Sequence, residues 1–282
     1  MPMSAKRQSI LCPNCRKLIS SSEAKCPYCG TAHPGSWYKH NAWTTGLRDP
    51  AQFIKYIIGV NAGMYILSIV FNAGGAGVAM NPLTFLSPAN DSLFLLGATG
   101  AIPIDRFQRY WTLISAGYLH GSILHIFFNM VALYQLASIV IREFGVYRMF
   151  AIYTLSGIFG FWVSYMAGVA LTIGASASVL GLIGAILFYG KSRGGIYGRS
   201  LYKQVAVWTV LIFIFGLVVR GINNWGHAGG LLAGIGLGFL LGYQEKKKET
   251  LFHKMLAGAC AIATLAALFW AVSTAVYYSI AG

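Results

Sequence analysis

The chain of 282 residues is 56% hydrophobic and only 10% charged, whereas a soluble globular domain carries roughly 25% charged residues. With a mean hydropathy of +0.62, this composition excludes an ordinary soluble domain and predicts an all-α polytopic membrane protein. The formal net charge is +14, but the basic residues lie in short loops between apolar stretches. Basic residues in such loops are typical of membrane proteins, where they set the orientation of the spans, so no nucleic-acid partner is expected.

Residues 1–50 contain two cysteine pairs with the spacing Cys-X-X-Cys. These pairs are Cys12 with Cys15 and Cys26 with Cys29. Two such pairs supply the four thiolates of a closed tetrahedral zinc site; the alternatives are two disulfides or free thiols, and the cytosol disfavours disulfides. We therefore expect a cytosolic ribbon folded by structural Zn²⁺, then a linker. The ribbon could bind a cytosolic partner, dock on the helices or serve only as a folded cap.

Seven apolar stretches are long enough to cross a bilayer, which takes about 20 residues. They lie near residues 54–73, 119–141, 148–170, 173–190, 203–220, 225–243 and 255–279. Several connections are very short, so neighbouring helices are predicted to be antiparallel. The long exception is 74–118, which carries Pro82, Pro88 and Pro103 and is expected to lie partly in the membrane interface.

The distribution of Lys and Arg predicts the orientation of the spans. With the N-terminus inside, 18 basic residues fall on the inner side and only three, Arg106, Arg109 and Arg220, on the outer side. This bias predicts a cytosolic N-terminus, an external C-terminus and an odd number of spans. We expect a six-helix core at 51–245, a cytosolic linker and a seventh helix at 246–282, and a location in a bacterial inner membrane.

Four polar residues are predicted to lie at a similar depth in the membrane. His125 and Asn129 come early in the second span, Ser176 early in the fourth and His227 early in the sixth. All three spans run from outside to inside, so at 1.5 Å per residue the four residues lie within roughly 15 Å of the outer surface. Ionisable groups inside spans are costly, and they are therefore candidates for a functional site.

The sequence around each of these polar residues suggests a role in the site, but it also allows a purely structural role. His125 and Asn129 are four residues apart, so they lie on the same helix face, and both can donate hydrogen bonds. His120 is rotated off that face at the helix mouth, where it is either bonded to loop backbone or simply an interfacial histidine. Gly174 predicts a turn before Ser176, so the serine would lie at a helix N-terminus, which suits an oxyanion. A small residue there could instead serve only close helix packing.

His227 stands on a helix with a regular glycine stripe. The stripe comprises Gly226, Gly230, Gly234, Gly238 and Gly242. Glycines at this spacing allow a second helix to approach closely, which would bring a partner such as a serine within reach of His227. A histidine in a span could equally be a satisfied structural group.

Three motifs in order resemble the rhomboid family of intramembrane proteases over roughly residues 54–243. They are His120-x4-His125-x3-Asn129, Gly174-x-Ser176 followed by Gly181 and Gly184, and His227-x2-Gly230-x3-Gly234. A further similarity is Arg142-Glu143-Phe144-Gly145 followed by Arg148. The expected fold is therefore a six-helix rhomboid core with an added zinc ribbon and seventh helix.

The resemblance implies a Ser–His dyad that cleaves transmembrane protein substrates within the lipid bilayer, with no catalytic cofactor. Ser176 would be the nucleophile and His227 the base, while the Ser176 N–H, Asn129 and His125 would form the oxyanion hole. His120, Gly174 and Gly230 would support them. The sequence departs from the family pattern at three positions: Ala177, Leu180 and Thr112 replace a common glycine, aromatic residue and arginine.

Three other functions are compatible with parts of the pattern. An inactive rhomboid-like protein would bind membrane clients, but such proteins generally lack the serine or the histidine. A transporter or channel would spread polar groups through the full bilayer depth. A ribbon that binds nucleic acid would need more basic residues near Cys12–Cys29.

Overall fold

The computed structural model describes residues 9–13, 15, 17–36, 50–71, 85–219 and 221–281. The chain divides into two compact units, Met1–Phe53 and Ile54–Gly282, and each is described by itself. Pro82, Arg220 and residues 37–49 of the segment 1–50 that was expected to hold the ribbon and linker lie outside the described residues.

The first unit is built on a two-stranded hairpin. Strand β1 (Ser9–Leu11) pairs antiparallel with β2 (Leu18–Ser20), with Ile10 opposite Ile19 and Leu11 opposite Leu18. Because side chains alternate between the two faces of a strand, the isoleucines point to one side and the leucines to the other. Ile19 packs with Cys12 and Cys26, and Ile10 lies against this cluster. The core of the unit is thus largely the cysteine cluster itself.

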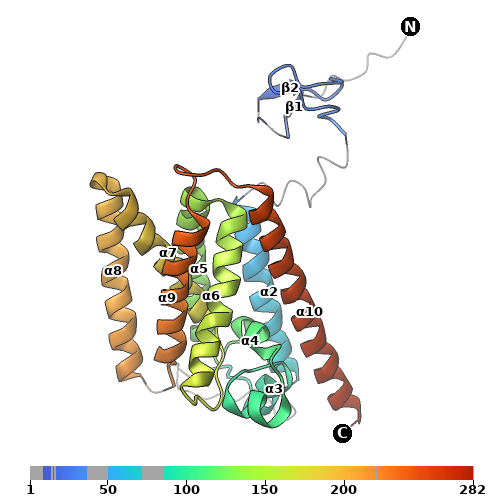
Figure 1. Ribbon diagram of the computed structural model, residues 1–282. Helices are drawn as coiled ribbons and strands as arrows, with labels where there is room; N and C mark the ends of the chain where they lie inside the picture. The colour runs from blue at the N-terminus through green and yellow to red at the C-terminus, as the bar shows by residue number, and fades with distance from the viewer. Residues whose placement is uncertain are drawn as a thin grey trace. The chain divides into compact units, whose positions relative to one another are not determined.

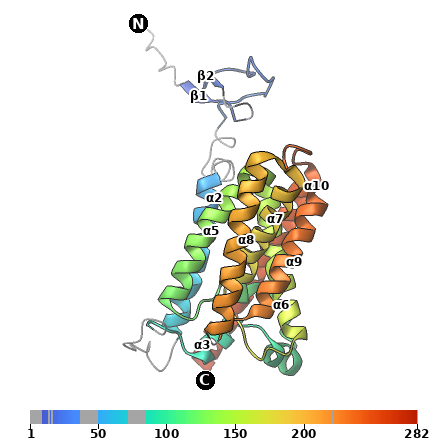
Figure 2. The same ribbon diagram turned by 90° about the vertical axis from the view of Figure 1, so that its left-hand side faces the viewer.

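The second unit is a bundle with a long helix at each of the seven expected stretches (Figures 1 and 2). These helices are α2 (Pro50–Val70), α5 (Ile123–Phe144), α6 (Val146–Met166), α7 (Ser176–Arg193), α8 (Gly195–Val218), α9 (Asn224–Leu241) and α10 (Leu251–Ala281). Helices α8 and α10 lie at opposite edges of the bundle, with α6, α7 and α9 between them. The chain is a multi-pass integral membrane protein.

Five of the helices are long and apolar enough to cross a membrane by length and composition, namely α2, α5, α6, α8 and α10. The other two, α7 and α9, have 18 residues each and are rich in glycine. They also carry polar residues at their ends, including Ser176, Arg193 and His227. Most residues of α7 are buried against neighbouring helices, which replace lipid around it, and the glycines of α9 face α7.

The helix starts differ from the expected boundaries by one to eight residues, and two of the differences have a clear cause. Helix α5 begins at Ile123 rather than 119 because Ser122 caps it and accepts a hydrogen bond from the His125 backbone N–H at 3.2 Å. Helix α8 begins at Gly195 rather than 203. Residues 195–202 add about two turns before the expected apolar stretch. They can be helical because backbone hydrogen bonds do not depend on the polarity of the side chains. Gly194 and Gly195, with φ of +67° and +65°, form the sharp turn from α7.

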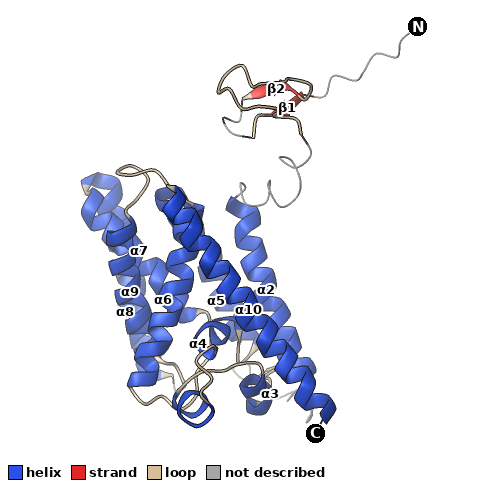
Figure 3. Ribbon diagram, turned by 45° about the vertical axis from the view of Figure 1, so that its right-hand side comes forward, coloured by secondary structure: helices blue, strands red, loops and turns tan. Residues whose placement is uncertain are grey.

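The described part of the long connection between α2 and α5 contains short helical segments (Figure 3). They are α3 (Asn90–Leu95), a π-helical turn at Ile102–Arg106, α4 (Thr112–Ser115) and a 3₁₀ turn at Ala116–Tyr118. Arg109 donates hydrogen bonds to the carbonyls of Phe94 and Leu95 at 2.9 and 3.2 Å, which ties the segment together.

Glycines bring α7 and α9 into direct backbone contact. A Cβ added at Gly230 would overlap the carbonyl oxygen of Ala177, and one at Gly234 would overlap that of Gly181. On α7, a Cβ at Gly184 would overlap the carbonyl of Leu231. The expected glycine stripe therefore does allow a close helix approach, and α7 is the partner.

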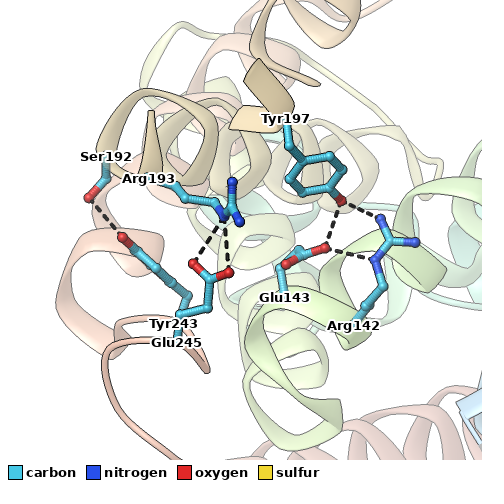
Figure 4. A network of polar contacts seen from close by, with 7 residues as sticks. All are labelled: Arg142, Glu143, Ser192, Arg193, Tyr197, Tyr243 and Glu245. Carbon is cyan, nitrogen blue, oxygen red and sulfur yellow. Dashed lines mark hydrogen bonds and ion pairs between the residues drawn. The ribbon is translucent and has the colours of Figure 1, made fainter. Parts of the chain in front are cut away.

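Polar contacts join the helix ends farthest from Ser176 (Figure 4). Glu143 at the end of α5 accepts from Arg142 and from the Tyr197 hydroxyl of α8, each at 2.7 Å. Arg193 at the end of α7 pairs with Glu245 at 3.0 Å. These contacts fix the end of the bundle opposite the candidate site.

Candidate active site

Ser176 and His227 come together although 51 residues separate them. Ser176 Oγ lies 2.9 Å from His227 Nε2. Ser176 is the first residue of α7, and His227 lies in the first turn of α9, so the two helices begin at the same end of the bundle. For the serine to donate this hydrogen bond, the imidazole proton must be on Nδ1.

His227 is held by packing rather than by a carboxylate. Its Nδ1 has no hydrogen-bond partner among the described residues, and the side chain is buried. The Phe213 ring of α8 stands edge-on to the imidazole, with centroids 6.3 Å apart and an interplanar angle of 89°. Leu180, where the rhomboid pattern has an aromatic residue, is also buried. The aromatic contact to His227 therefore comes from α8.

Gly174 brings His125 up to the Ser176 loop. Its φ of +119° is strained for any residue with a side chain, and an added Cβ would lie 2.8 Å from His125 Nε2. His125 Nδ1 accepts from the Gly121 backbone N–H at 3.2 Å. In the neutral ring the proton must therefore be on Nε2, the nitrogen that faces Gly174. His125 thus presents an N–H donor beside the start of α7.

Asn129 lies one turn below His125 on the same helix face and is buried. Its Nδ2 donates to the His125 carbonyl at 2.8 Å. This bond uses one of two amide protons, so the second remains available as a donor. No hydrogen bond between Asn129 and Ser176 is present among the described residues.

His120 is fully buried and packs against His125, with ring centroids 5.1 Å apart. Its ring nitrogens make no hydrogen bond of good geometry in the described part of the chain. Ser178 is buried too, and its Oγ lies against Gly157 of α6, where a Cβ would overlap it. His120 and Ser178 therefore make packing contacts.

Asn223 joins three segments around the site, and the sequence reasoning missed it. It caps α9, its Oδ1 accepting from the Gly226 N–H at 2.9 Å. Its Nδ2 donates to Ser164 Oγ of α6 at 2.6 Å and to Thr172 Oγ1 at 2.9 Å, in the loop that leads to Ser176. An asparagine directly before an apolar helical stretch is an N-cap signature, so the capping role of Asn223 could have been predicted from the sequence.

The four N-terminal cysteines cluster as a metal site would require. All four Sγ atoms lie within 4.8 Å of one another, with Cys12 to Cys29 at 3.6 Å and Cys15 to Cys26 at 3.7 Å. Zn–S bonds of about 2.3 Å in a tetrahedron give sulfur–sulfur distances of roughly 3.8 Å. None of the four is in a disulfide. Hydrogen bonds from Thr31 lower the pKa of the Cys29 thiol, whereas burial and the neighbouring thiols raise the pKa of Cys15.

Comparisons with known proteins find one family model and several relatives. A family model described as the Rhomboid domain matches residues 108–244. RHOMBOID-like protein 5 of Arabidopsis thaliana is 35% identical over 164 residues, which cover 55% of this chain and 52% of that protein. Rhomboid protease GluP of Bacillus subtilis is 32% identical over 161 residues, or 57% of this chain and 31% of that protein.

Rhomboid-like protease 3 of Toxoplasma gondii matches over a longer stretch. It is 29% identical over 243 residues, which cover 82% of this chain and 81% of that protein. The chain spans about half the length, or less, of the first relatives it matches. Residues 108–244, which include the helices that carry Ser176 and His227, therefore form a rhomboid domain.

Proposed function

We propose that this chain is an intramembrane serine protease that hydrolyses peptide bonds in or near the transmembrane helices of other membrane proteins. The observation that carries the proposal is the 2.9 Å contact between Ser176 Oγ and His227 Nε2. A serine and an imidazole within hydrogen-bond reach form the minimal activated nucleophile.

In the first half of the reaction, Ser176 Oγ forms a bond to the scissile carbonyl carbon while its proton passes to His227 Nε2. The tetrahedral intermediate then breaks its C–N bond, and His227 returns the proton to the leaving amine. In the second half, His227 takes a proton from water, the hydroxide attacks the acyl ester, and Ser176 leaves with the proton. No carboxylate of the described residues contacts His227 Nδ1, so we propose that the pair acts as a dyad.

Three donors are proposed to hold the oxyanion. The backbone N–H of Ser176 lies at the start of α7, where helix N–H groups lack intrahelical partners and the dipole favours negative charge. His125 offers Nε2–H beside Gly174, and Asn129 offers its second amide proton. These donors lie on two helices that packing holds in place, as preorganised charge stabilisation requires.

We further propose that the four cysteines bind one structural Zn²⁺ in the N-terminal unit, which the spacing of the sulfur atoms supports. The metal would fold a unit with almost no other core. The Lys and Arg distribution supports a cytosolic N-terminus and an external site. On this orientation, substrates would unwind near the outer face.

The test is cleavage of a panel of single-span substrates by purified protein. Ser176→Ala and His227→Ala should each abolish cleavage, and the double variant should be no worse, because the two residues act as a unit. Ser178→Ala is the matched control and should stay active, since its hydroxyl faces Gly157. Labelling by a fluorophosphonate should be lost only with Ser176 or His227. Cleavage by Ser176→Ala would refute the proposal and favour a rhomboid-like protein that only binds clients.

A further inference from the structure

The hairpin of the N-terminal unit presents a pair of exposed leucines. Leu11 and Leu18 are direct partners in the β1–β2 register, and their exposed fractions are 58% and 65%. Alternation directs the two isoleucines of the same strands toward the cysteine cluster. The leucines therefore contribute little to the core, although they are the largest apolar side chains of the hairpin's other face.

Tyr28 and Lys17 extend this surface. Lys17, the residue before Leu18, has its Nζ 4.4 Å from the centroid of the Tyr28 ring. Tyr28 is itself 57% exposed. We call Leu11, Lys17, Leu18 and Tyr28 the hairpin surface. It combines aliphatic side chains, an amphipathic ring and a cation, which is the composition of segments that bind at the interface of a bilayer.

The charge of the unit favours an anionic surface. One acidic residue, Glu23, stands against five basic ones within residues 1–36, namely Lys6, Arg7, Arg16, Lys17 and Lys25. Lysines and arginines next to a membrane are attracted to anionic headgroups over about a Debye length, roughly 10 Å at 0.1 M salt.

Only a short segment joins the cysteine-containing ribbon to the helices. Residues 37–49 lie between the ribbon and α2, which begins at Pro50. Even a fully extended chain of this length reaches only on the order of 45 Å. Binding to the bilayer is therefore an intramolecular event at high effective concentration, so a small surface is sufficient.

From these observations we propose that the hairpin surface docks on the anionic lipid headgroups of the membrane that holds the helices. Leu11, Leu18 and the Tyr28 ring would enter the interface, while Lys17 would pair with lipid phosphates. This inference concerns only the N-terminal unit and is independent of the proposed protease activity.

The experiment uses the full-length, zinc-loaded protein in nanodiscs of phosphatidylcholine alone or mixed with phosphatidylglycerol. The rate at which an amine-reactive acetylating reagent modifies Lys17 is measured by mass spectrometry at low and high salt. We expect Lys17 to react several-fold more slowly in the anionic nanodiscs, and we expect high salt to remove most of this protection.

Variants separate docking from a general effect of the surface charge. The double variant Leu11→Ser/Leu18→Ser keeps every charge and every cysteine, so it should retain zinc but lose the protection. Glu23→Lys should increase the protection. Equal rates for Lys17 in both lipids would overturn the proposal and favour a protein partner. Full protection in the leucine variant would overturn it as well, because charge alone would then explain the effect.

Discussion

Replacing Gly230 by alanine should misalign Ser176 and His227 without touching either side chain. The new Cβ would overlap the carbonyl oxygen of Ala177 and would lie 2.9 Å from its carbonyl carbon, whereas ordinary contacts are about 3.5–4.0 Å. The two backbones must therefore separate by about 1 Å. Ala177 adjoins Ser176, and Gly230 is three residues from His227, so most of this shift should reach the contact of 2.9 Å between them.

A serine–histidine contact lengthened to about 3.6 Å or more is no longer a hydrogen bond, and a misplacement of 1 Å can cost about 100-fold in rate. We expect Gly230→Ala to lower kcat by about that factor and to destabilise the fold by ~1–3 kcal/mol through overpacking. Cleavage of a single-span substrate gives the rate, and thermal unfolding in detergent gives the stability.

Gly236→Ala on the same helix is the matched control, because a Cβ there meets nothing within 4 Å. It should leave both the rate and the stability nearly unchanged. Wild-type activity in Gly230→Ala would refute the reasoning, since the α7–α9 contact would then not determine the geometry of the pair. An equal loss in Gly236→Ala would refute it too, because the effect would come from α9 in general.

Four further outcomes are expected. Asn129→Ala should reduce turnover by about 10- to 1000-fold with little effect on folding, as loss of one oxyanion donor does elsewhere; a wild-type rate would make Asn129 structural. Asn223→Ala should weaken the cap by ~1 kcal/mol and slow cleavage more than Asn224→Ala, measured on the same substrate. Metal analysis should find about one zinc per chain, released by Cys12→Ser. Deleting residues 1–40 should leave cleavage intact in the same assay.

The sequence was sufficient to predict the features of the fold that depend on the length of apolar stretches and on the spacing of motifs. Seven apolar stretches predicted seven long helices, and the glycine stripe around Gly230 predicted a close helix partner. The nearness of Ser176 to His227 could be inferred because both come early in helices that run the same way. Their chemical roles stay a prediction until the variants are assayed.

Contacts that depend on helix rotation or on loop backbone could not be read from the sequence. To predict the Phe213 contact to His227, one must know how α8 is oriented about its own axis. Helix α8 is apolar nearly all round, so its hydropathy pattern does not define which face packs on the bundle. The contact between the His120 and His125 rings could not be predicted for a similar reason, since the path of the loop before α5 decides where His120 lies.

The attachment of the seventh helix also depends on backbone groups. Arg148, at the start of α6, is fully buried, and its guanidinium donates to the carbonyls of Phe144, Lys247 and Lys248 at 3.0, 2.6 and 3.0 Å. The Glu249 carboxylate accepts from the Arg148 backbone N–H at 2.9 Å, across 101 residues. The linker before α10 is therefore bound to the turn between α5 and α6.

The same contacts predict a pH dependence of stability. Burial raises the pKa of the Glu249 carboxyl group above its ordinary value. The folded protein therefore holds the Glu249 proton more tightly than the unfolded chain does. The contribution of this group to the free energy of unfolding is fully present below the unfolded carboxyl pKa of about 4.3. It is lost as the pH rises through the raised pKa of the folded state. Glu249→Gln keeps an acceptor for the Arg148 N–H and cannot ionise, so thermal unfolding in detergent should show less decline with pH. Glu249→Ala leaves a buried N–H without a partner and should cost ~1–3 kcal/mol. Equal stabilities for the Gln and Ala variants at every pH would show that Glu249 does not hold the linker.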